Sequence, residues 1–500
     1  MEFETKQAGT TGQAGDSVFL KDASLLCTRC YVAGSWQEAD DGATFEVCNP
    51  ATGRLIARVP QMGARETRRA IEAANSAWKD WRAQTSKSRA AVLRRWYELM
   101  IENADDLARI MTAEQGKPIA EAKGEILYAA SFLEWFAEEG KRTYGDTIPS
   151  PAPDKRIIVT KEPVGVCAAI TPWNFPAAMI TRKVGPALAA GCPIVVKPAE
   201  ATPLSALALA ELADRAGVPA GVFSVITGDP KTIGSELTGN PIVRKLSFTG
   251  STAVGKLLMK QCAATVKKVS LELGGNAPFI VFDDADLDAA VAGAMASKYR
   301  NSGQTCVCVN RFFVHERVYE AFAERLCVAV NQLKVGDGTV EGVTQGPLIN
   351  EAAVRKVESH IENAVSMGGR VAIGGVRHKL GRSFFQPTVL TQVDAAMQIA
   401  REEVFGPVAP LFKFISEDEV IHLANDTEFG LAAYIYSRDI GRIWRVAEAL
   451  DYGIVGINTG LISNEVAPFG GVKQSGVGRE GSHYGIDDYL VTKYLCLAGL

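Results

Sequence analysis

The sequence predicts an α/β fold built on two doubly wound parallel sheets. Strand-like and helical runs alternate from Val164 to Leu273, and a second alternation of the same kind follows. Such alternation is typical of parallel strands whose two faces are covered by helices. The length of 500 residues predicts about three domains at ~150 residues each, and the apolar fraction of 47% allows a large core.

The composition excludes several classes of function. The formal net charge is −4 and acidic and basic residues are interspersed, so a nucleic-acid partner is not expected. No run of ~18 apolar residues occurs, so no membrane span is expected. The N-terminus is Gly-, Thr- and Ala-rich up to Ser17 and lacks the apolar core of a signal peptide. We therefore expect residues 1–25 to be a flexible tail and the protein to be cytoplasmic.

The N-terminal part is predicted as strands, then helices, then an arm. Residues 31–60 alternate like strands around a hairpin turn at 49–53. Three helical runs follow, at 64–81, 87–113 and 117–144. The segment Ile148-Pro149-Ser150-Pro151-Ala152-Pro153 cannot be the interior of a helix. Residues 145–163 are therefore expected to form an extended arm suited to packing on a neighbour.

The two α/β alternations are read from the periodicity of the apolar residues. In the first, strands are expected at 164–170, 193–197, 222–227, 245–248 and 268–273, with the clearest helices at 204–216 and 252–264. In the second, strands are expected at 279–282, 312–314, 433–436 and 454–458, and helices at 287–299, 318–332, 351–366, 418–424 and 440–449. Residues 489–496 return to strand character. Ligands of such sheets bind at the carboxyl ends of the strands.

Cysteine and histidine spacing does not indicate a metal site. Ten cysteines in 500 residues are too few for a disulfide scaffold. Cys27 and Cys30 have CxxC spacing, but no second cysteine pair or histidine pair completes a set of four zinc ligands. We therefore expect no metal.

Two glycine-rich segments resemble nucleotide-binding motifs. Residues 476–481 match GxGxxG, but they follow a loop and only 19 residues remain after them, so we interpret these glycines as turn residues. Residues 250–256 nearly match a P-loop, but Leu257 stands where the magnesium-binding hydroxyl is required. The order of strand, glycine turn and helix still places backbone N–H groups where they can bind phosphate without magnesium, and a plain turn is the alternative.

The loop from Arg300 to Asn310 is the strongest candidate for chemistry. It is polar, contains the two thiols Cys306 and Cys308, and lies between a helical run and a strand-like run. Loops in such positions often display reactive groups, and a cysteine there is a nucleophile if its pKa falls. The alternative is a pair of small buried residues beside a turn.

Seven segments, in the same order along the chain, resemble the NAD(P)-dependent aldehyde dehydrogenases from about residue 30 to the end. They are Thr171-Pro172-Trp173-Asn174-Phe175-Pro176, Val196-Lys197-Pro198-Ala199-Glu200, Phe248-Thr249-Gly250-Ser251-Thr252, Leu271-Glu272-Leu273-Gly274-Gly275, the Cys306 loop, Glu402-Glu403-Val404-Phe405-Gly406-Pro407 and Pro468-Phe469-Gly470-Gly471. Residues 303–308 and 468–489 are most similar to the succinate-semialdehyde branch of this family.

The resemblance implies a covalent mechanism. Cys306 would attack the aldehyde carbonyl and form a thioester after hydride transfer. The Asn174 amide and the Cys306 backbone N–H would stabilise the oxyanion, and Glu272 would be the general base for thioester hydrolysis. The residue pattern by itself leaves Glu272 open, because its alternation with Leu271 and Leu273 also fits a surface acid.

The resemblance also implies two Rossmann-like domains, one of which binds the cofactor. Lys197 and Glu200 follow the second strand, where the adenine ribose of a dinucleotide is bound. Glu200 would repel a 2′-phosphate, so we expect NAD to be preferred over NADP. The other residues implied to bind the cofactor are Thr171, Trp173, Gly250, Ser251, Glu403 and Phe405.

The substrate implied by the resemblance is succinic semialdehyde, oxidised to succinate, as in 4-aminobutyrate degradation. Arg182, Arg300 and Ser463 match the positions that bind its carboxylate, and arginine is suited to that group. Glutarate semialdehyde is the alternative substrate, because one CH₂ changes binding by only ~1–3 kcal/mol, and a broader aldehyde specificity also stays open. A cysteine-dependent hydrolase or acyltransferase would use Cys306 and Glu272 without the cofactor residues.

Cys308 is not needed for this mechanism. If the loop were extended, residues 306 and 308 would be about 6.6 Å apart, at the edge of disulfide range. A reversible disulfide would then protect Cys306 from over-oxidation, and the alternative is an incidental small residue.

The family also implies a division of the chain. Residues 26–144 and 164–273 are expected to form the NAD-binding domain, and residues 274–485 the catalytic domain. Residues 145–163 and 486–500 are expected to form a small β oligomerisation arm, which predicts a homodimer or homotetramer.

Overall fold

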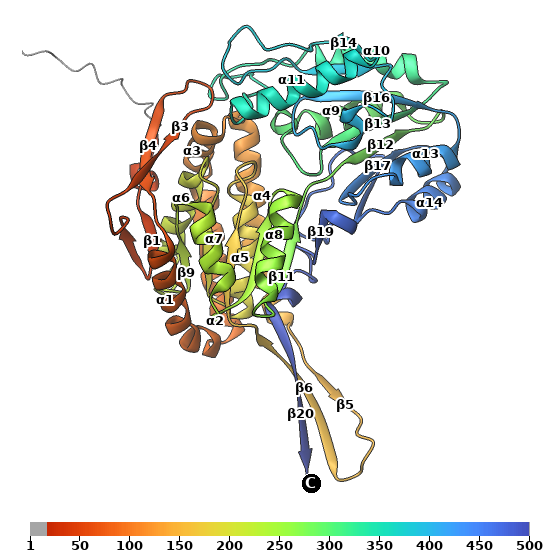
Figure 1. Ribbon diagram of the computed structural model, residues 1–500. Coiled ribbons are helices and arrows are strands. Elements are labelled where there is room, and N and C mark those ends of the chain that lie inside the picture. The colour runs from red at the N-terminus through yellow and green to blue at the C-terminus, as the bar shows by residue number, and fades with distance from the viewer. Residues whose placement is uncertain (1–17, 500) are drawn as a thin grey trace, which may run out of the picture.

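Two large sheets and one small sheet organise the chain into two α/β domains and a projecting arm (Figure 1). The structure is a computed structural model that describes residues 18–499. The N-terminal colours of Figure 1 form the first domain, and the C-terminal colours form most of the second. No helix within residues 18–499 is both long and apolar enough to cross a membrane.

The first domain contains an eight-stranded sheet whose central strands are parallel. The strand order is β19-β11-β10-β7-β8-β9-β1-β2. The bounds are β1 (Cys30–Val32), β2 (Ser35–Gln37), β7 (Val166–Ile170), β8 (Ile194–Lys197), β9 (Phe223–Val225), β10 (Val243–Thr249), β11 (Lys268–Glu272) and β19 (Gly476–Val477). β7 lies between β8 and β10, so the strand order reverses there. Ligands of open α/β sheets bind at this switch point, so the loop that follows β7 is placed at the expected site.

Helices cover both faces of this sheet, and a β3–β4 hairpin lies beside it. The bounds are β3 (Thr44–Cys48), β4 (Leu55–Pro60), α1 (Ala64–Ala83), α2 (Ser86–Glu102), α3 (Ala104–Gln115), α4 (Ile119–Glu139), α5 (Ala178–Ala190), α6 (Pro203–Arg215), α7 (Pro230–Gly239) and α8 (Thr252–Ala263). The single helix expected over 87–113 is two helices. Asn103 separates them with φ −107° and ψ 17°, and its side chain donates to Leu99 O at 2.8 Å.

Residues 18–25, within the expected tail, pack onto this domain. Leu25 in the 3₁₀ turn η1 (Ala23–Leu25) is buried. The backbone N–H groups of Lys21 and Asp22 both donate to the Asp106 carboxylate, at 3.0 and 2.8 Å. The remainder of the expected tail, residues 1–17, lies outside the described residues.

The second domain contains a seven-stranded sheet in the order β14-β15-β16-β13-β12-β17-β18, parallel except for β14. The strand bounds are β12 (Ala277–Val281), β13 (Val309–His315), β14 (Arg370–Ile373), β15 (Thr388–Thr391), β16 (Val408–Phe414), β17 (Ala432–Tyr436) and β18 (Ile454–Ile457). The helix bounds are α9 (Leu287–Lys298), α10 (Tyr319–Val330), α11 (Glu351–Ser366), α12 (Gln398–Arg401), α13 (Glu417–Asn425) and α14 (Ile440–Ala449). The two doubly wound sheets expected from the alternation are thus both present.

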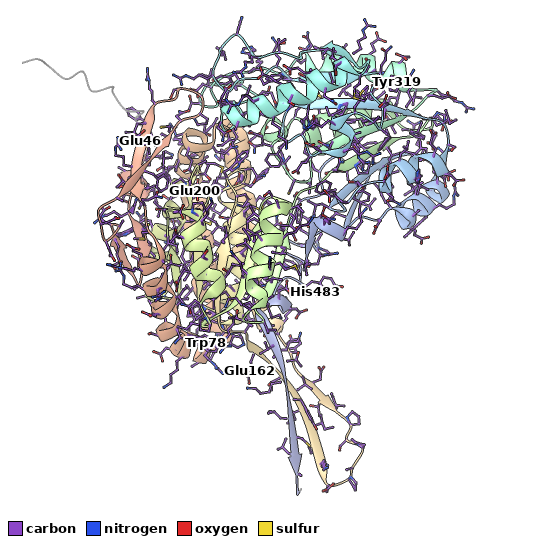
Figure 2. All side chains as sticks on the ribbon, in the orientation of Figure 1. Glu46, Trp78, Glu162, Glu200, Tyr319 and His483 are labelled. Carbon is purple, nitrogen blue, oxygen red and sulfur yellow. The ribbon has the colours of Figure 1, made fainter. Side chains whose placement is uncertain are left out.

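The arm is a three-stranded antiparallel sheet that extends away from both domains (Figure 1). It consists of β5 (Asp146–Ile148), β6 (Lys155–Pro163) and β20 (Leu490–Ala498), and β20 pairs with β6 from Leu490↔Pro163 to Ala498↔Lys155. Glu162 marks its root (Figure 2). Just before the arm, β19 hydrogen-bonds to β11 of the first sheet, so a strand from the segment expected to be catalytic joins the other domain.

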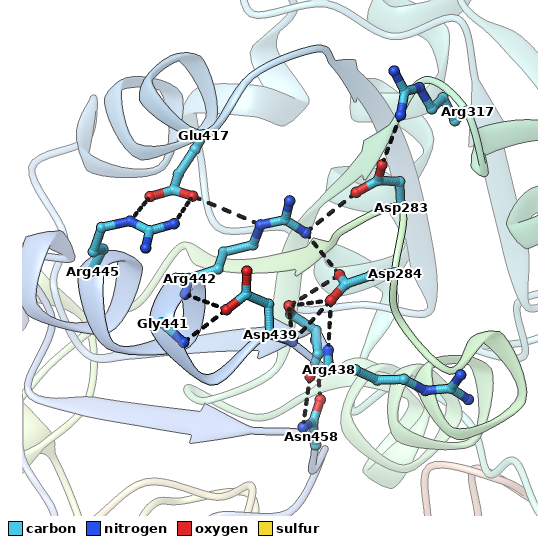
Figure 3. A network of polar contacts seen from close by, with 11 residues as sticks. Asp283, Asp284, Arg317, Glu417, Arg438, Asp439, Gly441, Arg442, Arg445 and Asn458 are labelled. Atoms are coloured by element: carbon cyan, nitrogen blue, oxygen red, sulfur yellow. Dashed lines mark hydrogen bonds and ion pairs between the residues drawn. The ribbon is translucent and has the colours of Figure 1, made fainter.

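A polar network fixes the N-terminus of α14 to the end of β12 (Figure 3). The Asp284 carboxylate accepts hydrogen bonds from Ser437 Oγ and from the backbone N–H groups of Arg438 and Asp439. Arg442 of α14 donates to Asp284 at 2.8 Å and also lies near Asp283 and Glu417. One carboxylate therefore satisfies several donors at the start of the helix.

We expect Asp284→Ala to lower the free energy of unfolding by about 1–3 kcal/mol, because it leaves these donors without their acceptor. Chemical denaturation measures the change. The matched control is Glu46→Ala, which removes one exposed ion pair with Arg58 and is expected to cost less than ~1 kcal/mol. Equal losses for the two variants would show that the Asp284 network adds nothing beyond a surface pair.

Candidate active site

A cavity of about 400 Å³ lies between the two domains, and we call it the main cavity because Cys306 and several other predicted site residues line it. It is bounded by the loop after β7, the turn between β10 and α8, the Cys306 loop and the segment after α12. The residues predicted from the sequence that line it are Trp173, Asn174, Gly250, Ser251, Cys306, Glu403 and Phe405. Segments far apart in the chain therefore meet where the sequence predicted a site.

The Cys306 loop is a series of tight turns. It begins with the 3₁₀ turn η3 (Arg300–Gly303), in which Asn301 and Ser302 have positive φ angles of 51° and 55°. Gly303 also has positive φ, and a Cβ there would lie 2.2 Å from Gly406 O. The backbone N–H of Cys308 donates to Thr305 O at 3.0 Å. The extended geometry assumed for residues 306–308 is therefore wrong, because this turn curves the backbone.

The two thiols of this loop have different surroundings. Cys306 is partly exposed and lines the cavity, whereas Cys308 is buried and its Sγ donates to Val309 O at 3.3 Å. Burial raises the pKa of Cys306 to about 12, and the negative charge of Glu403 adds to the rise while Arg182 opposes it. Cys306 is therefore protonated at neutral pH in this arrangement and has to lose its proton before it can attack. Both thiols are free, and a disulfide between them stays a prediction.

Asn174 is held by contacts from both sides of the cavity. Its backbone carbonyl accepts from Lys117 Nζ at 2.7 Å and from Asn301 Nδ2 at 3.0 Å. Its side-chain amide donates to Gln304 O at 3.1 Å, which leaves a second N–H on the same nitrogen. The loop after β7 and the Cys306 loop are thus hydrogen-bonded directly to each other.

A buried ion pair supports this contact. Lys117 Nζ lies 2.5 Å from Glu125 Oε2, and both side chains are 1% exposed. Glu125 Oε1 accepts from the N–H of Ala177 at 3.0 Å, at the start of α5. Burial lowers the pKa of Lys117, and Glu125 opposes that fall. The sequence analysis did not identify Lys117, Glu125 or Asn301, because a lysine and a glutamate eight residues apart in a helical region give no local signal.

Glu272 is the last residue of β11 and is buried. Burial raises its pKa well above the usual value, the negative charge of Glu480 raises it further, and Arg182 and Lys183 lower it. Its Oε2 has no hydrogen-bond partner among residues 18–499. The surface-acid alternative is therefore wrong, and Glu272 has the raised pKa expected of a base that works near neutral pH.

The three residues expected to bind a carboxylate are placed differently. Arg300 and Ser463 line the same second cavity, which has a volume of about 290 Å³. The Arg300 guanidinium lies 5.0 Å from the centre of the Phe175 ring. Arg182 lines neither cavity. Its Nε lies 2.7 Å from Glu480 Oε2, and its guanidinium stacks 4.1 Å from the Phe469 ring.

The residues expected to bind a cofactor also divide into two groups. Trp173 and Phe405 meet edge to face at 5.6 Å in the main cavity. Glu403 accepts from the Gly275 N–H at 3.1 Å, and burial raises its pKa to about 7. Outside that cavity, Lys197 at the end of β8 forms an ion pair with Glu200.

Two further predicted residues complete this part of the site. Glu200 belongs to the first domain (Figure 2) and its side chain is 43% exposed. Thr171 is buried beside β8, and its N–H donates to Lys197 O at 3.1 Å.

The glycine-rich segment 476–481 forms part of the frame of the site. Gly476 pairs with Glu272 through β19, and Gly478 and Gly481 have positive φ. Glu480 within it is buried and forms ion pairs with Arg182 and Lys183. No group of three or more metal-ligating side chains occurs in the described range 18–499.

Comparison with known proteins explains this arrangement. Residues 36–495 match the sequence pattern of the aldehyde dehydrogenase family. The chain belongs to this family. The resemblance, the fold class and the oxidation of aldehydes predicted from the sequence are thereby confirmed, and a hydrolase or acyltransferase is not supported.

Several aldehyde dehydrogenases are similar over nearly the full length. The 3-sulfolactaldehyde dehydrogenase of Pseudomonas putida is 66% identical over 96% of this chain and 99% of the relative. The glutarate-semialdehyde dehydrogenase of Pseudomonas aeruginosa is 66% identical over 96% and 100%. The NADP⁺ succinate-semialdehyde dehydrogenase of Escherichia coli is 65% identical over 96% and 99%. A crystal structure of succinate-semialdehyde dehydrogenase from Burkholderia pseudomallei has a TM-score of 0.95 at 73% identity, over 96% of this chain and 99% of that one.

Aldehyde dehydrogenases use NAD(P), and the main cavity of this chain fits such a group. β10 ends at Thr249, and α8 begins after Ser251, whose hydroxyl caps the helix by accepting from the Val254 N–H. The N-terminus of α8 therefore presents unpaired backbone N–H groups beside the cavity, which suits a pyrophosphate. At Gly274 a Cβ would lie 3.2 Å from Glu403 Oε2, so a larger residue would crowd this side of the cavity.

Proposed function

We propose that the protein oxidises a semialdehyde that carries a terminal carboxylate, with succinic semialdehyde as substrate, succinate as product and NAD as oxidant. One observation carries the proposal. The Arg300 guanidinium lines a cavity together with Ser463 and forms no salt bridge with any acidic side chain of residues 18–499. Arg300 is half-buried at the edge of this cavity, and a carboxylate ligand fits its planar fork.

In the proposed mechanism, Cys306 Sγ gives its proton to a water molecule and bonds to the aldehyde carbon. The second N–H of the Asn174 amide and the backbone N–H of Cys306 donate to the resulting oxyanion. NAD, when bound, supplies the hydride acceptor, and Trp173, Glu403, Phe405 and the turn at Gly250 and Ser251 would hold it in the main cavity. The product on the protein is then a Cys306 thioester.

Glu272 completes the cycle as the general base. It takes a proton from water as the water attacks the thioester carbonyl, and Cys306 leaves as a thiolate that is then reprotonated. A carboxylate with a raised pKa is a stronger base than an ordinary one and is suited to this step. The first domain would bind the cofactor through residues 26–144 and 164–273, and residues 274–485 would supply the nucleophile.

The alternative substrates share the anionic end. Relatives named for glutarate semialdehyde and 3-sulfolactaldehyde are as similar as those named for succinic semialdehyde. All three aldehydes would present an anion to Arg300. We place the enzyme in a reaction sequence that produces a semialdehyde, such as 4-aminobutyrate degradation in the cytoplasm.

We propose that NAD is preferred over NADP. Glu200 is partly exposed at the end of β8 and its carboxylate neutralises the Lys197 ammonium. A 2′-phosphate would meet a pair with no net positive charge, whereas ribose hydroxyls would find an acceptor. A relative from Escherichia coli is named for NADP⁺, so the cofactor must be measured for this chain. Equal kcat/KM with NAD and NADP would reject the preference.

We also propose that the arm packs on a second copy of the chain, giving a dimer or tetramer. It projects from the body (Figure 1) and exposes several large apolar side chains, namely Ile148, Ile158, Tyr494, Leu495 and Leu497. Exposed apolar strands of this kind mark an interaction surface. Light scattering that gives the mass of a single chain would contradict this proposal.

Arg300→Ala tests the proposed substrate. We expect kcat/KM for succinic semialdehyde to fall about 100-fold or more, because a charge-assisted bidentate contact is lost. For butanal, which has the same carbon chain without the carboxylate, we expect a change of less than about threefold. NADH formation followed by absorbance measures both.

The control for this experiment is Arg317→Ala, which removes an arginine that is exposed and pairs only with Asp283 at the surface. It should leave both substrates unaffected. Equal losses on the charged and the neutral aldehyde in Arg300→Ala would reject the carboxylate clamp.

The pH dependence of thioester hydrolysis tests the base. Glu272 must be ionised to act, so the rate falls as the pH drops through its raised pKa. Glu480→Gln removes a negative charge that raises the pKa of Glu272 and leaves Arg182 and Lys183, which lower it. The loss of the Glu480 charge and the two remaining cations both lower the pKa of Glu272. We therefore expect the acidic limb of the kcat profile to move to lower pH by roughly one unit or more.

The exposed residue Glu46 on the β3–β4 hairpin provides the control, since Glu46→Gln removes the same charge at a position that lines neither cavity. If the acidic limb of the kcat profile stays at the same pH or moves to higher pH in Glu480→Gln, Glu272 is not the group whose ionisation controls that limb.

A further inference from the structure

The hydroxyl of Tyr128 is buried and has no hydrogen-bond partner among residues 18–499. Tyr128 lies on α4 and lines the same cavity of about 290 Å³ as Arg300 and Ser463. A buried hydroxyl without a partner destabilises the protein, and such groups in native structures require an explanation. The sequence analysis did not identify this residue, which lies in a helical run without any motif.

The ring of Tyr128 is held in a fixed orientation. It packs edge to face on Phe132 of the same helix, with the ring centres 4.9 Å apart. Phe132 also contacts a cation, because the Arg182 guanidinium lies 5.6 Å from the Phe132 ring centre. Tyr128 therefore lines the cavity with a side chain whose apolar body packs on Phe132 and whose hydroxyl is left without a partner in the described part of the chain.

Among the charged groups that act on the hydroxyl, the two with the largest effect are arginines, and Glu480 acts in the opposite direction. Burial raises the pKa of Tyr128, while the positive charges of Arg182 and Arg300 both lower it. The hydroxyl remains protonated at neutral pH, because its ordinary pKa is near 10 and the net change is upward. It is thus a neutral donor placed within the field of two arginines. A carboxylate in the cavity would find the Arg300 guanidinium and the hydroxyls of Tyr128 and Ser463. The two acidic residues of the same lining already have partners, since Glu125 pairs with Lys117 and Glu121 accepts from the Asn301 N–H.

We propose that Tyr128 is a specificity-determining residue that donates a hydrogen bond to the terminal anionic group of the substrate, beside Arg300 and Ser463. The inference rests on the proposed function, because it requires a substrate with an anionic end. The Tyr128 hydroxyl has no partner among residues 18–499 of the free protein because its acceptor is the carboxylate of the bound substrate. This role of Tyr128 also explains how the anion is bound although Arg182 is occupied by Glu480.

Tyr128→Phe separates this role from packing, because it removes only the hydroxyl and keeps the ring on Phe132. We expect kcat/KM for succinic semialdehyde to fall about 10- to 100-fold, mainly through KM, since a hydrogen bond to a charged group is lost. For butanal we expect a change of less than about twofold. Succinate carries the same carboxylate without reacting, and as a competitive inhibitor it should bind about tenfold or more weakly to the variant.

The matched control is Tyr97→Phe on α2, a half-buried tyrosine that lines neither cavity. It should leave both substrates and succinate inhibition unchanged. Thermal unfolding of both variants shows whether they fold like the wild type. If turnover by the Tyr128 variant is low, the inhibition constant of succinate still measures how tightly the carboxylate binds.

The outcomes distinguish the two proposals. If the wild type prefers succinic semialdehyde to butanal and Tyr128→Phe keeps that preference, Tyr128 serves packing and the inference is overturned, while the proposed function stands. Equal losses on both aldehydes in Tyr128→Phe would overturn it as well. If the wild type has no preference for the charged aldehyde, the proposed function falls and the inference falls with it.

Discussion

The backbone carbonyl of Asn174 accepts hydrogen bonds from Lys117 and Asn301 at the same time, and the active site depends on this junction. Lys117 belongs to the first domain, whereas Asn301 begins the loop that carries Cys306. Because the Lys117–Glu125 pair is buried, removing one partner would leave an uncompensated charge, at a cost of about 3–5 kcal/mol. The position of the proposed oxyanion donor relative to the proposed nucleophile is thus set by contacts that are expensive to break.

A second buried charge network connects the proposed base to the proposed anion site. Glu480 lies on the segment that pairs with β11, forms ion pairs with Arg182 and Lys183, and raises the pKa of Glu272. Arg182 stacks between Phe469 and Phe132, and Phe132 orients Tyr128. Substitutions at Glu480 are therefore expected to affect both hydrolysis and substrate choice, since one arginine touches both regions.

The sequence identified those parts of the site that lie at the ends of strands. Ser251 after β10 was marked by a strand followed by a glycine turn. Glu272 at the end of β11 was found through the family resemblance, because its alternation with Leu271 and Leu273 also fits a surface acid. Tyr128 and Lys117 were missed because they lie in or beside a helix, where their type and spacing resemble any packed or solvated residue. The carboxylate role assigned to Arg182 stays a prediction, since only folding brings Glu480 to it. The extended geometry at Cys308 was wrong because residues 305–308 form a turn, in which the Cys308 N–H donates to Thr305 O.

Trapping the covalent intermediate tests the central claim most directly. Glu272→Gln, supplied with succinic semialdehyde and NAD, is expected to release one burst of NADH and then to accumulate a succinyl thioester, because the base for hydrolysis is absent. Peptide mass spectrometry should locate the succinyl group on Cys306, and Cys306→Ala should carry none. A succinyl group on Cys308, or steady turnover of Glu272→Gln without any adduct, would contradict the assignment of nucleophile and base.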